Sequence, residues 1–273
     1  MKKSFVLSLT VVIMFVLAVT SCAHKTEIIV DGYRFQWMAS KGAYTATTGD
    51  ASLLANFVNL SSSLTERVQR VSLLVEGKRF IAVVEGDMPQ SLFKTGMLLS
   101  KDFGRKKGES WYSSPDGEYL IGQPQNNLVV VTNEDYPSAE QLVMDTFASK
   151  KIDDDTALLM ASADVAVFSE NPSELPSMPI FFGDFSASGI VRLLLTAKNQ
   201  TLSLKMEFEN QKLCGAFAKL MKLSYIARLK KAGLAVDLAA LKKQFVEEVN
   251  VFSASGLIMS QEELDGIISS IKI

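Results

Sequence analysis

Apolar residues along this chain fall into short runs separated by polar turn residues, and several runs are followed by a stretch with helical spacing. The clearest case predicts strands at 71–75 and 80–84 joined by a tight turn, and then a helix from 88 to 99. Asp87 precedes this helix and Pro89 stands in its first turn, where a proline loses no hydrogen bond. The pattern therefore predicts a strand–turn–strand–helix unit.

The same unit recurs later in the chain. A second copy is predicted with strands at 118–122 and 128–132 and a helix at 138–148, about 48 residues after the first. Two similar helix starts, at 211 and 261, lie about 50 residues apart in the second half. We therefore predict two related halves, with an ancient duplication as the hypothesis. The other predicted elements are helices at 48–60, 62–71, 211–234 and 261–271 and strands at 163–168, 189–195, 201–208 and 250–259.

Residues 27–37 are predicted to form a hairpin around an Asp-Gly pair, which favours a tight type I′ turn. Tyr33, Phe35 and Trp37 alternate along its second strand, so they share one face of the sheet. Two interpretations of this face stay open. It is either a half-buried core, which we favour, or an exposed surface on which a ligand stacks.

Together these patterns predict an α+β fold, with antiparallel sheets covered by helices. The sheets are expected in two similar subdomains built from strand–turn–strand–helix units. The first subdomain is assigned to residues 27–150 and the second to residues 151–273. The junction is placed in the charged stretch 149–155, and the basic loop 104–108 is expected to be mobile.

The first 21 residues differ from the rest of the chain. Lys2 and Lys3 are followed by an apolar run from Phe5 to Val19 and then by small residues. This order is typical of a secretory signal peptide. The run of about 15 apolar residues is shorter than the ~20 that a membrane-spanning helix needs. Residues 1–21 are therefore interpreted as a signal peptide.

Residues 19–22 read Val-Thr-Ser-Cys and resemble the lipobox of bacterial lipoproteins. The resemblance implies cleavage before Cys22, a diacylglycerol on its sulfur and an acyl chain such as palmitate on its amino group. Cys22 would then be a lipidation site, and residues 22–26 a tether. Two or three acyl chains attach a protein durably to a membrane. The layout of the body is similar to that of uncharacterised envelope lipoproteins, and Ala23 favours the outer membrane over the inner one.

The charge balance limits the classes of partner. Without residues 1–21, the chain has 26 basic and 30 acidic side chains, or −4. A mildly acidic protein without a basic run has no electrostatic footprint for nucleic acid, so nucleic-acid binding is excluded. The expected partners are the membrane, through the anchor on Cys22, and an envelope protein or an apolar ligand.

Cysteine and histidine usage narrows the chemistry. If Cys22 is lipidated, Cys214 has no disulfide partner, and its place in a helical pattern predicts a buried, inert thiol. His24 is the sole histidine of the sequence, which argues against Ser-His-Asp and Cys-His hydrolases and against imidazole-based zinc sites. The stretch 153–155 (Asp-Asp-Asp) lacks the spacing of an EF-hand, so a solvated turn is favoured over a Ca²⁺ site. We therefore predict no catalytic residue, metal or cofactor.

Two further places are candidate binding surfaces. Trp111 and Tyr112 are possible ligand-facing aromatics, although we favour a core or interface role for them. The helix at 213–232 has an apolar stripe interpreted as facing the sheet, with basic residues facing solvent. A membrane-surface or partner-docking role is the alternative to this packing. The predicted stripe consists of Leu213, Phe217, Leu220, Leu223, Ile226 and Ala227.

The leading functional prediction is a non-enzymatic lipoprotein of the bacterial cell envelope that presents a binding or assembly module at a membrane surface. It rests on the lipobox, the single histidine and the lack of metal-ligand spacing. The alternative is a periplasmic carrier of a lipid or another apolar molecule, because eleven methionines suit an adaptable cavity lining. A carboxylate- or lysine-based enzyme is the third and least favoured class.

Overall fold

The computed structural model describes residues 44–48, 67–76, 78–99, 103–105, 111–142, 153–170, 172 and 189–270. Several predictions therefore lie outside the described residues. They are the signal peptide, Cys22 and its tether, the aromatic hairpin with Tyr33, Phe35 and Trp37, and the predicted helix at 48–60 beyond its first residue.

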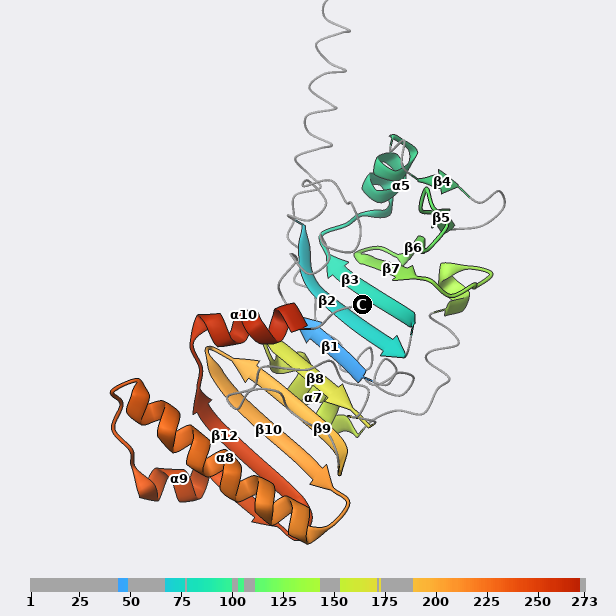
Figure 1. Cartoon of the computed structure of the whole chain (residues 1–273). Helices are drawn as coiled ribbons and strands as arrows, with labels where there is room; N and C mark the ends of the chain where they lie inside the picture. The colour runs from blue at the N-terminus through green and yellow to red at the C-terminus, as the bar shows by residue number, and fades with distance from the viewer. Residues whose placement is uncertain are drawn as a thin grey trace, which may run out of the picture.

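Within the residues that the structure describes, twelve antiparallel strands form one continuous sheet (Figure 1). Their order is β11-β12-β10-β9-β8-β1-β2-β3-β7-β6-β5-β4, so the chain's first half fills one side of the sheet and its second half the other. The strands are β1 (Tyr44–Thr48), β2 (Val68–Glu76), β3 (Arg79–Gly86), β4 (Gly104–Arg105), β5 (Trp111–Ser113), β6 (Leu120–Gln125), β7 (Leu128–Thr132), β8 (Val165–Ser169), β9 (Ile190–Lys198), β10 (Thr201–Phe208), β11 (Phe245–Glu248) and β12 (Val251–Ile258).

The predicted strand–turn–strand–helix unit occurs in both halves. Hairpins β2–β3, β6–β7, β9–β10 and β11–β12 are each followed by helical residues. Asn199 and Gln200 take positive φ at the β9–β10 turn, as a two-residue hairpin requires. The described helices are α5 (Gln90–Leu99), α7 (Asp154–Ser162), α8 (Gln211–Lys231), α9 (Leu238–Gln244) and α10 (Gln261–Ser270), and residues 139–142 are also helical.

Strand β1 joins the two halves. Its residue Ala46 is opposite Leu73 of β2 on one side and opposite Val167 of β8 on the other. Arg70 of β2 reaches past β1 and donates a hydrogen bond to the Ala163 carbonyl at 3.2 Å. The two predicted subdomains are therefore adjoining parts of one sheet, and the α+β class is confirmed. The proposed boundary at 150/151 lies outside the described residues.

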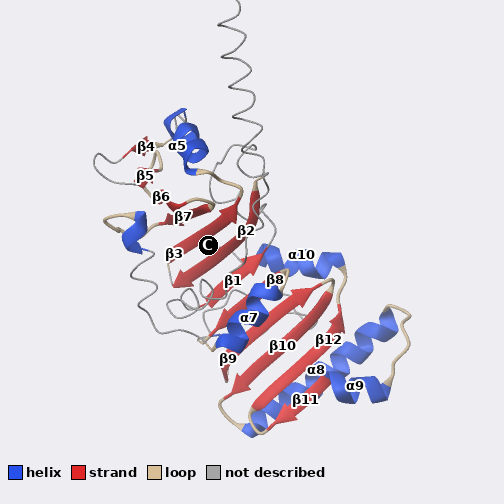
Figure 2. Cartoon of the chain, turned by 180° about the vertical axis from the view of Figure 1, so that it is seen from behind, coloured by secondary structure: helices blue, strands red, loops and turns tan. Residues whose placement is uncertain are grey.

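One face of the sheet carries a core that runs through both halves. Side chains of α5, α8, α9 and α10 pack on this face, among them Phe93, Met221 and Ile267. The opposite face carries two smaller clusters, one under residues 139–142 and one under α7. The two views agree, since α8 crosses in front of β10 and β12 in Figure 1 and lies behind them in Figure 2, where α7 is in front.

Several predicted elements need correction. The helix predicted at 62–71 is wrong over its last residues, because Val68–Val71 belong to β2 and pair with β3. Gly104 and Arg105, expected in a mobile loop, pair with β5 as the edge strand β4. The solvated turn expected at 153–155 is instead the start of α7. Asp153 caps that helix by accepting the Thr156 N–H at 2.8 Å.

Five further elements were not predicted. They are β1, β5, α7, α9 and β11, which have five, three, nine, seven and four residues. Thr48, predicted as the first residue of a helix, is the last residue of β1. Within the described ranges, no helix combines the length and apolar character needed to cross a membrane.

Candidate functional site on the α8–α9 hairpin

Helix α8 begins and ends with well-formed caps. At its start the Asn210 side chain caps the helix by accepting the Leu213 N–H at 3.0 Å. At its end Gly233 takes a positive φ of 69°. There the Leu234 N–H donates to the Leu229 carbonyl and the Gly233 N–H to the Lys230 carbonyl. This Schellman arrangement turns the chain back toward α9.

The buried face of α8 differs from the predicted one. Its buried residues are Cys214, Ala218, Met221, Tyr225 and Leu229, which recur every three or four positions. The ring of Phe217 lies 5.2 Å from that of Phe208 and 5.5 Å from that of Phe252. Phe217 therefore packs against two phenylalanines of the sheet, at the edge of the buried side of α8.

The leucines predicted to face the sheet lie on the outside of α8 instead. Leu220 is 58% exposed and Leu223 is 65% exposed, while Leu213 at the helix start is also exposed. Phe217 and Ile226 of the predicted stripe are partly buried against the core. The orientation predicted for Leu213, Leu220 and Leu223 is therefore wrong, and α8 presents a leucine stripe to its surroundings.

Lysines follow one flank of this stripe. Lys212, Lys219 and Lys230 are exposed and separated by seven and eleven residues, spacings that return side chains to nearly the same side of a helix. Lys222 is nearer the sheet, with its amino group 5.9 Å from the centre of the Phe245 ring. An exposed leucine stripe beside a lysine row is typical of helices that lie in a membrane interface.

Charge is strongly segregated along the chain. Residues 211–244, which form α8, α9 and their connection, carry eight basic side chains and one acidic one, a balance of +7. The whole chain has 28 basic and 30 acidic side chains, so the remaining residues carry 20 and 29, or −9. A modest net charge therefore hides a basic α8–α9 hairpin on an acidic body.

Side chains of α8 hold the end of β12 and the start of α10. The Tyr225 hydroxyl accepts the Ile258 N–H at 3.1 Å, and Arg228 donates to the Ile258 carbonyl and to both carboxylate oxygens of Glu263. Ser260 and Glu263 form a capping box at the start of α10, because the Glu263 N–H donates to the Ser260 hydroxyl and the Ser260 N–H donates to the Glu263 carboxylate. Partial burial acts to raise the pKa of Glu263, but hydrogen bonds from Arg228 and Ser260 outweigh it and hold that pKa below its ordinary value.

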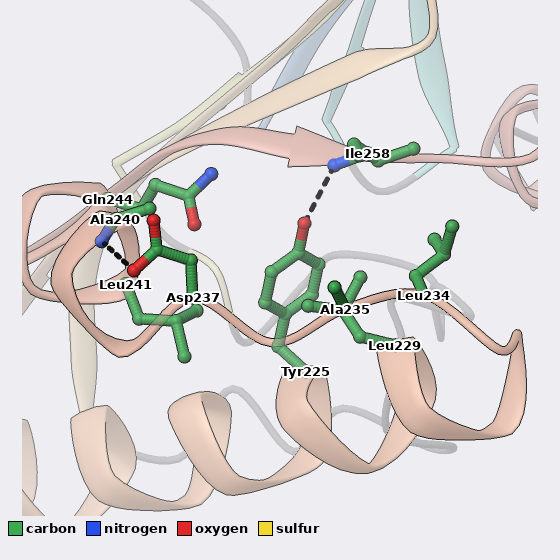
Figure 3. Close-up of a pocket in the computed structure, with 9 residues that line it drawn as sticks. All are labelled: Tyr225, Leu229, Leu234, Ala235, Asp237, Ala240, Leu241, Gln244 and Ile258. Carbon is green, nitrogen blue, oxygen red and sulfur yellow. Dashed lines mark hydrogen bonds between the residues drawn. The ribbon is translucent and has the colours of Figure 1, made fainter.

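A pocket of about 220 Å³ opens between the end of α8, α9 and the end of β12 (Figure 3). Tyr225 rises from α8 toward Ile258, with Asp237 on one side and Leu234 on the other. Asp237 is engaged as the cap of α9, where it accepts the Ala239 and Ala240 N–H groups. The remaining lining residues are Leu229, Ala235, Ala240, Leu241 and Gln244.

The described aromatic residues that the sequence offered as a binding site lie away from the α8–α9 hairpin. Trp111 is 0% exposed and Tyr112 is 6% exposed, and the two pack in core clusters on opposite faces of the sheet. The Trp111 indole N–H donates to the Tyr136 carbonyl at 2.8 Å. Both side chains are therefore core residues, the role favoured for them from the sequence, and the structure does not bring them to the α8–α9 hairpin.

Cys214, a residue of α8, is fully buried, as predicted. Burial, followed by the nearby charge of Glu247, raises the pKa of its thiol, which keeps the sulfur protonated and unreactive. Among the described residues, no group of three or more His, Cys, Asp or Glu side chains is placed to hold a metal ion.

Comparison with known proteins shows the fold. No protein-family model and no curated protein matches the sequence. Three crystal forms of the protein TP0453 are similar in structure at 13% sequence identity. Form I has a TM-score of 0.57 over 87% of this chain and 97% of that one. Form IV has a TM-score of 0.54 over 86% and 96%, and form III 0.53 over 86% and 97%. At this identity the likeness establishes the α+β architecture alone.

Proposed function

We propose that this protein is a lipid-anchored, non-enzymatic component of the bacterial cell envelope whose folded body binds the membrane surface through the α8–α9 hairpin. The observation that carries the proposal is the exposed leucine stripe of α8, with Leu220 and Leu223 more than half exposed. Fully burying one leucine side chain is worth roughly 1.5–3 kcal/mol. Two or three leucines therefore supply a useful part of an interfacial contact.

The charge of the hairpin supports an anionic surface as the target. Basic residues near an anionic leaflet contribute about 1 kcal/mol each, and residues 211–244 carry a balance of +7. Without residues 1–21, the rest of the chain has 18 basic and 29 acidic side chains, or −11, and is repelled by the same surface. The molecule is therefore expected to approach lipid with α8 first. The anchor expected on Cys22 keeps the body within reach of that surface.

The carrier alternative receives less support. The pocket beside α8 has a volume of about 220 Å³. Pockets that hold drug-sized ligands typically enclose roughly 300–1,000 Å³. This pocket therefore does not favour transport of a whole lipid.

Vesicle binding by protein that lacks the anchor tests the proposal. A chain that begins at Ala23 is mixed with vesicles of phosphatidylethanolamine and phosphatidylglycerol, or of phosphatidylcholine alone, and co-sedimentation is measured. We expect binding to the anionic vesicles that weakens as salt rises, because screening shortens the reach of the lysines. Replacing both Leu220 and Leu223 with glutamate should lower binding by about tenfold or more.

The matched control is the leucine pair on α7, on the opposite face of the sheet. Leu158 and Leu159 are 67% and 50% exposed, close to the values for the α8 pair. Changing both to glutamate adds the same charge and removes the same apolar area, yet should leave binding intact. Equal losses from the two pairs, or no loss from the α8 pair, would refute the role of α8.

A further inference from the structure

The tip of the β11–β12 hairpin carries an unusual residue. Val249 and Asn250 connect Glu248 and Val251, which pair with each other. Val249 has a positive φ of 52° and is 71% exposed. The described non-glycine residues with positive φ also include Asn127, Asn199 and Gln200, and of the four Val249 alone is β-branched. A β-branched side chain is disfavoured in this conformation, which suits glycine or asparagine.

This position therefore combines backbone strain with exposure of an apolar side chain. Either glycine or asparagine would relieve the strain, and either would suit solvent better. Strained residues that persist in a fold cluster at binding and functional positions. A contact made by its side chain therefore explains the presence of valine at this position better than a requirement of folding does.

The surroundings of Val249 are acidic. Glu247 and Glu248 precede it, and the carbonyl of Asn250 accepts the Phe208 N–H at 2.8 Å, which ties the tip to the end of β10. Glu207 and Glu209 flank Phe208 there. These four glutamates outnumber the two neighbouring basic residues, which are Lys212 in the first turn of α8 and Arg192 of β9, opposite Glu207. The tip therefore presents one exposed apolar side chain, that of Val249, among glutamates next to the start of α8. We call this side chain the knob.

The other end of α8 has the complementary character. The pocket beside it, about 220 Å³ in volume, is lined mainly by apolar side chains that include Leu229 and Leu241. Lys230 and Lys231 in the last turn of α8, and Lys242 and Lys243 in α9, are exposed on the two elements that form its walls. The volume is ample for a valine side chain.

Knob and pocket lie at opposite ends of one helix. Helix α8 has 21 residues and is therefore about 30 Å long. A rigid tip at one end cannot enter a pocket at the other end of the same molecule. Any occupant that matches the pocket in this way has to come from a second chain.

We propose that Val249 of one copy of the protein inserts into the α8–α9 pocket of another copy, with glutamates around the tip facing lysines around the pocket. The contact joins different surfaces of the two copies, so it is heterologous. One copy of the pair keeps a free pocket and the other keeps a free knob. Such contacts build rings or open rows. The contact is small and therefore weak in solution. It does not depend on the membrane-binding role proposed above.

Disulfide trapping in the full chain tests this contact. Two differently tagged copies are co-expressed in a bacterial envelope, one carrying Val249→Cys and the other Leu234→Cys at the pocket. The native Cys214 is fully buried, and the thiol of Cys22 is expected to carry the lipid. Copies without an introduced cysteine measure any background from these two residues. After mild oxidation we expect a mixed disulfide dimer, with a yield that falls at about 1 M salt because charges are then screened within ~3 Å.

The matched control pairs Val249→Cys with Leu99→Cys on α5, a position that is 78% exposed and remote from the pocket. The yield of this mixed dimer should be lower by about tenfold or more. Equal yields for the two pairs, or no mixed dimer with Leu234→Cys, would overturn the proposal.

A second variant separates the contact from folding. Val249→Gly relieves the strained φ, so the midpoint of thermal unfolding should rise. The same change removes the knob, so zero-length carbodiimide cross-linking between copies, which joins neighbouring glutamates and lysines, should fall by about tenfold relative to the natural chain. Cross-linking that persists in Val249→Gly would show that another surface, such as the leucine stripe of α8, holds the copies together, and would overturn the proposal.

Discussion

At the scale of single residues, Gly122 of β6 lies in a closely packed part of the core of the first half. A Cβ at this position would lie 2.7 Å from the Ala139 Cβ and 2.7 Å from the Trp111 ring. Neither neighbour can easily withdraw, because the Trp111 indole is held by its bond to the Tyr136 carbonyl and is fully buried. The indole can take this place because residue 122 has no side chain.

We therefore expect Gly122→Ala to lower the free energy of unfolding by about 1–3 kcal/mol, the usual effect of overpacking a core. Gly96 is the matched control. It lies within α5, and a Cβ there would meet no atom within 4 Å. Gly96→Ala should raise stability by up to about 1 kcal/mol, since alanine favours the helix. Chemical denaturation of the two variants checks both signs. A neutral Gly122→Ala would mean that β6 and residues 139–142 are packed less closely than described.

At the scale of elements, α8 shows what could and could not be read from the sequence. Its length, its Asn210 cap and the hairpin that precedes it were predictable from local pattern. Which side of the helix faces the sheet was not predictable in this way. The helix carries two apolar stripes, and the one with Leu220 and Leu223 is outside. Which stripe is buried depends on tertiary packing against phenylalanines of the sheet. The sequence of the helix alone carries no pattern that reveals this packing.

The missed elements have a similar cause. Helices α7 and α9 and strand β11 are short, and short elements are stabilised by what they pack against more than by propensity. Strand β11 is held by its pairing with β12, where Phe245 lies opposite Ala254. For the same reason, the sequence offered a membrane-surface or partner-docking role for helix α8 only as the alternative to core packing. A useful signal was nonetheless present, since residues 211–244 hold eight basic side chains and a single acidic one.

The junction of α8 with α10 should make stability depend on pH. Partial burial acts to raise the pKa of Glu263. Hydrogen bonds from Arg228 and Ser260 outweigh this effect and hold the pKa below its ordinary value of 4.5. A carboxyl with a lowered pKa binds fewer protons in the folded state, so its contribution is complete above pH 4.5 and is lost as the pH falls through the folded value. We expect Glu263→Gln to lower the free energy of unfolding at pH 7 and to flatten its decline in acid. Urea unfolding at pH 7 and pH 3 measures both effects.

The control for this prediction is the neighbouring exposed Glu262, whose change to glutamine alters the same net charge. Glu262→Gln should retain the acid-induced decline of the natural protein. If the two variants had the same pH dependence, the Arg228–Glu263 junction would not be the origin of the effect. Repulsion within the whole molecule would then explain it.

At the scale of the whole molecule, the two halves depend on each other through a narrow connection. Strand β1 comes from the start of the first half, yet it pairs with β2 on one side and with β8, the first strand of the second half, on the other. Arg70 strengthens this connection by its bond to Ala163, and burial lowers the pKa of its guanidinium against the opposing influence of Glu85 and Asp164. The core on one face also runs through both halves.

Proline at Ala46 tests whether β1 is what makes the molecule fold as one unit. Ala46 lies at the centre of β1, opposite Leu73 and Val167, and a proline there removes a ladder hydrogen bond and is not tolerated in a central strand. We expect thermal unfolding of Ala46→Pro to separate into two transitions, because each half keeps its own hairpins and helices. Val246→Pro in the edge strand β11 is the control, and it should leave one transition at a slightly lower temperature. A single cooperative transition for Ala46→Pro would assign the coupling to the shared core. The two halves would then be one domain that merely resembles a pair, because burial across the sheet face would hold them together without β1.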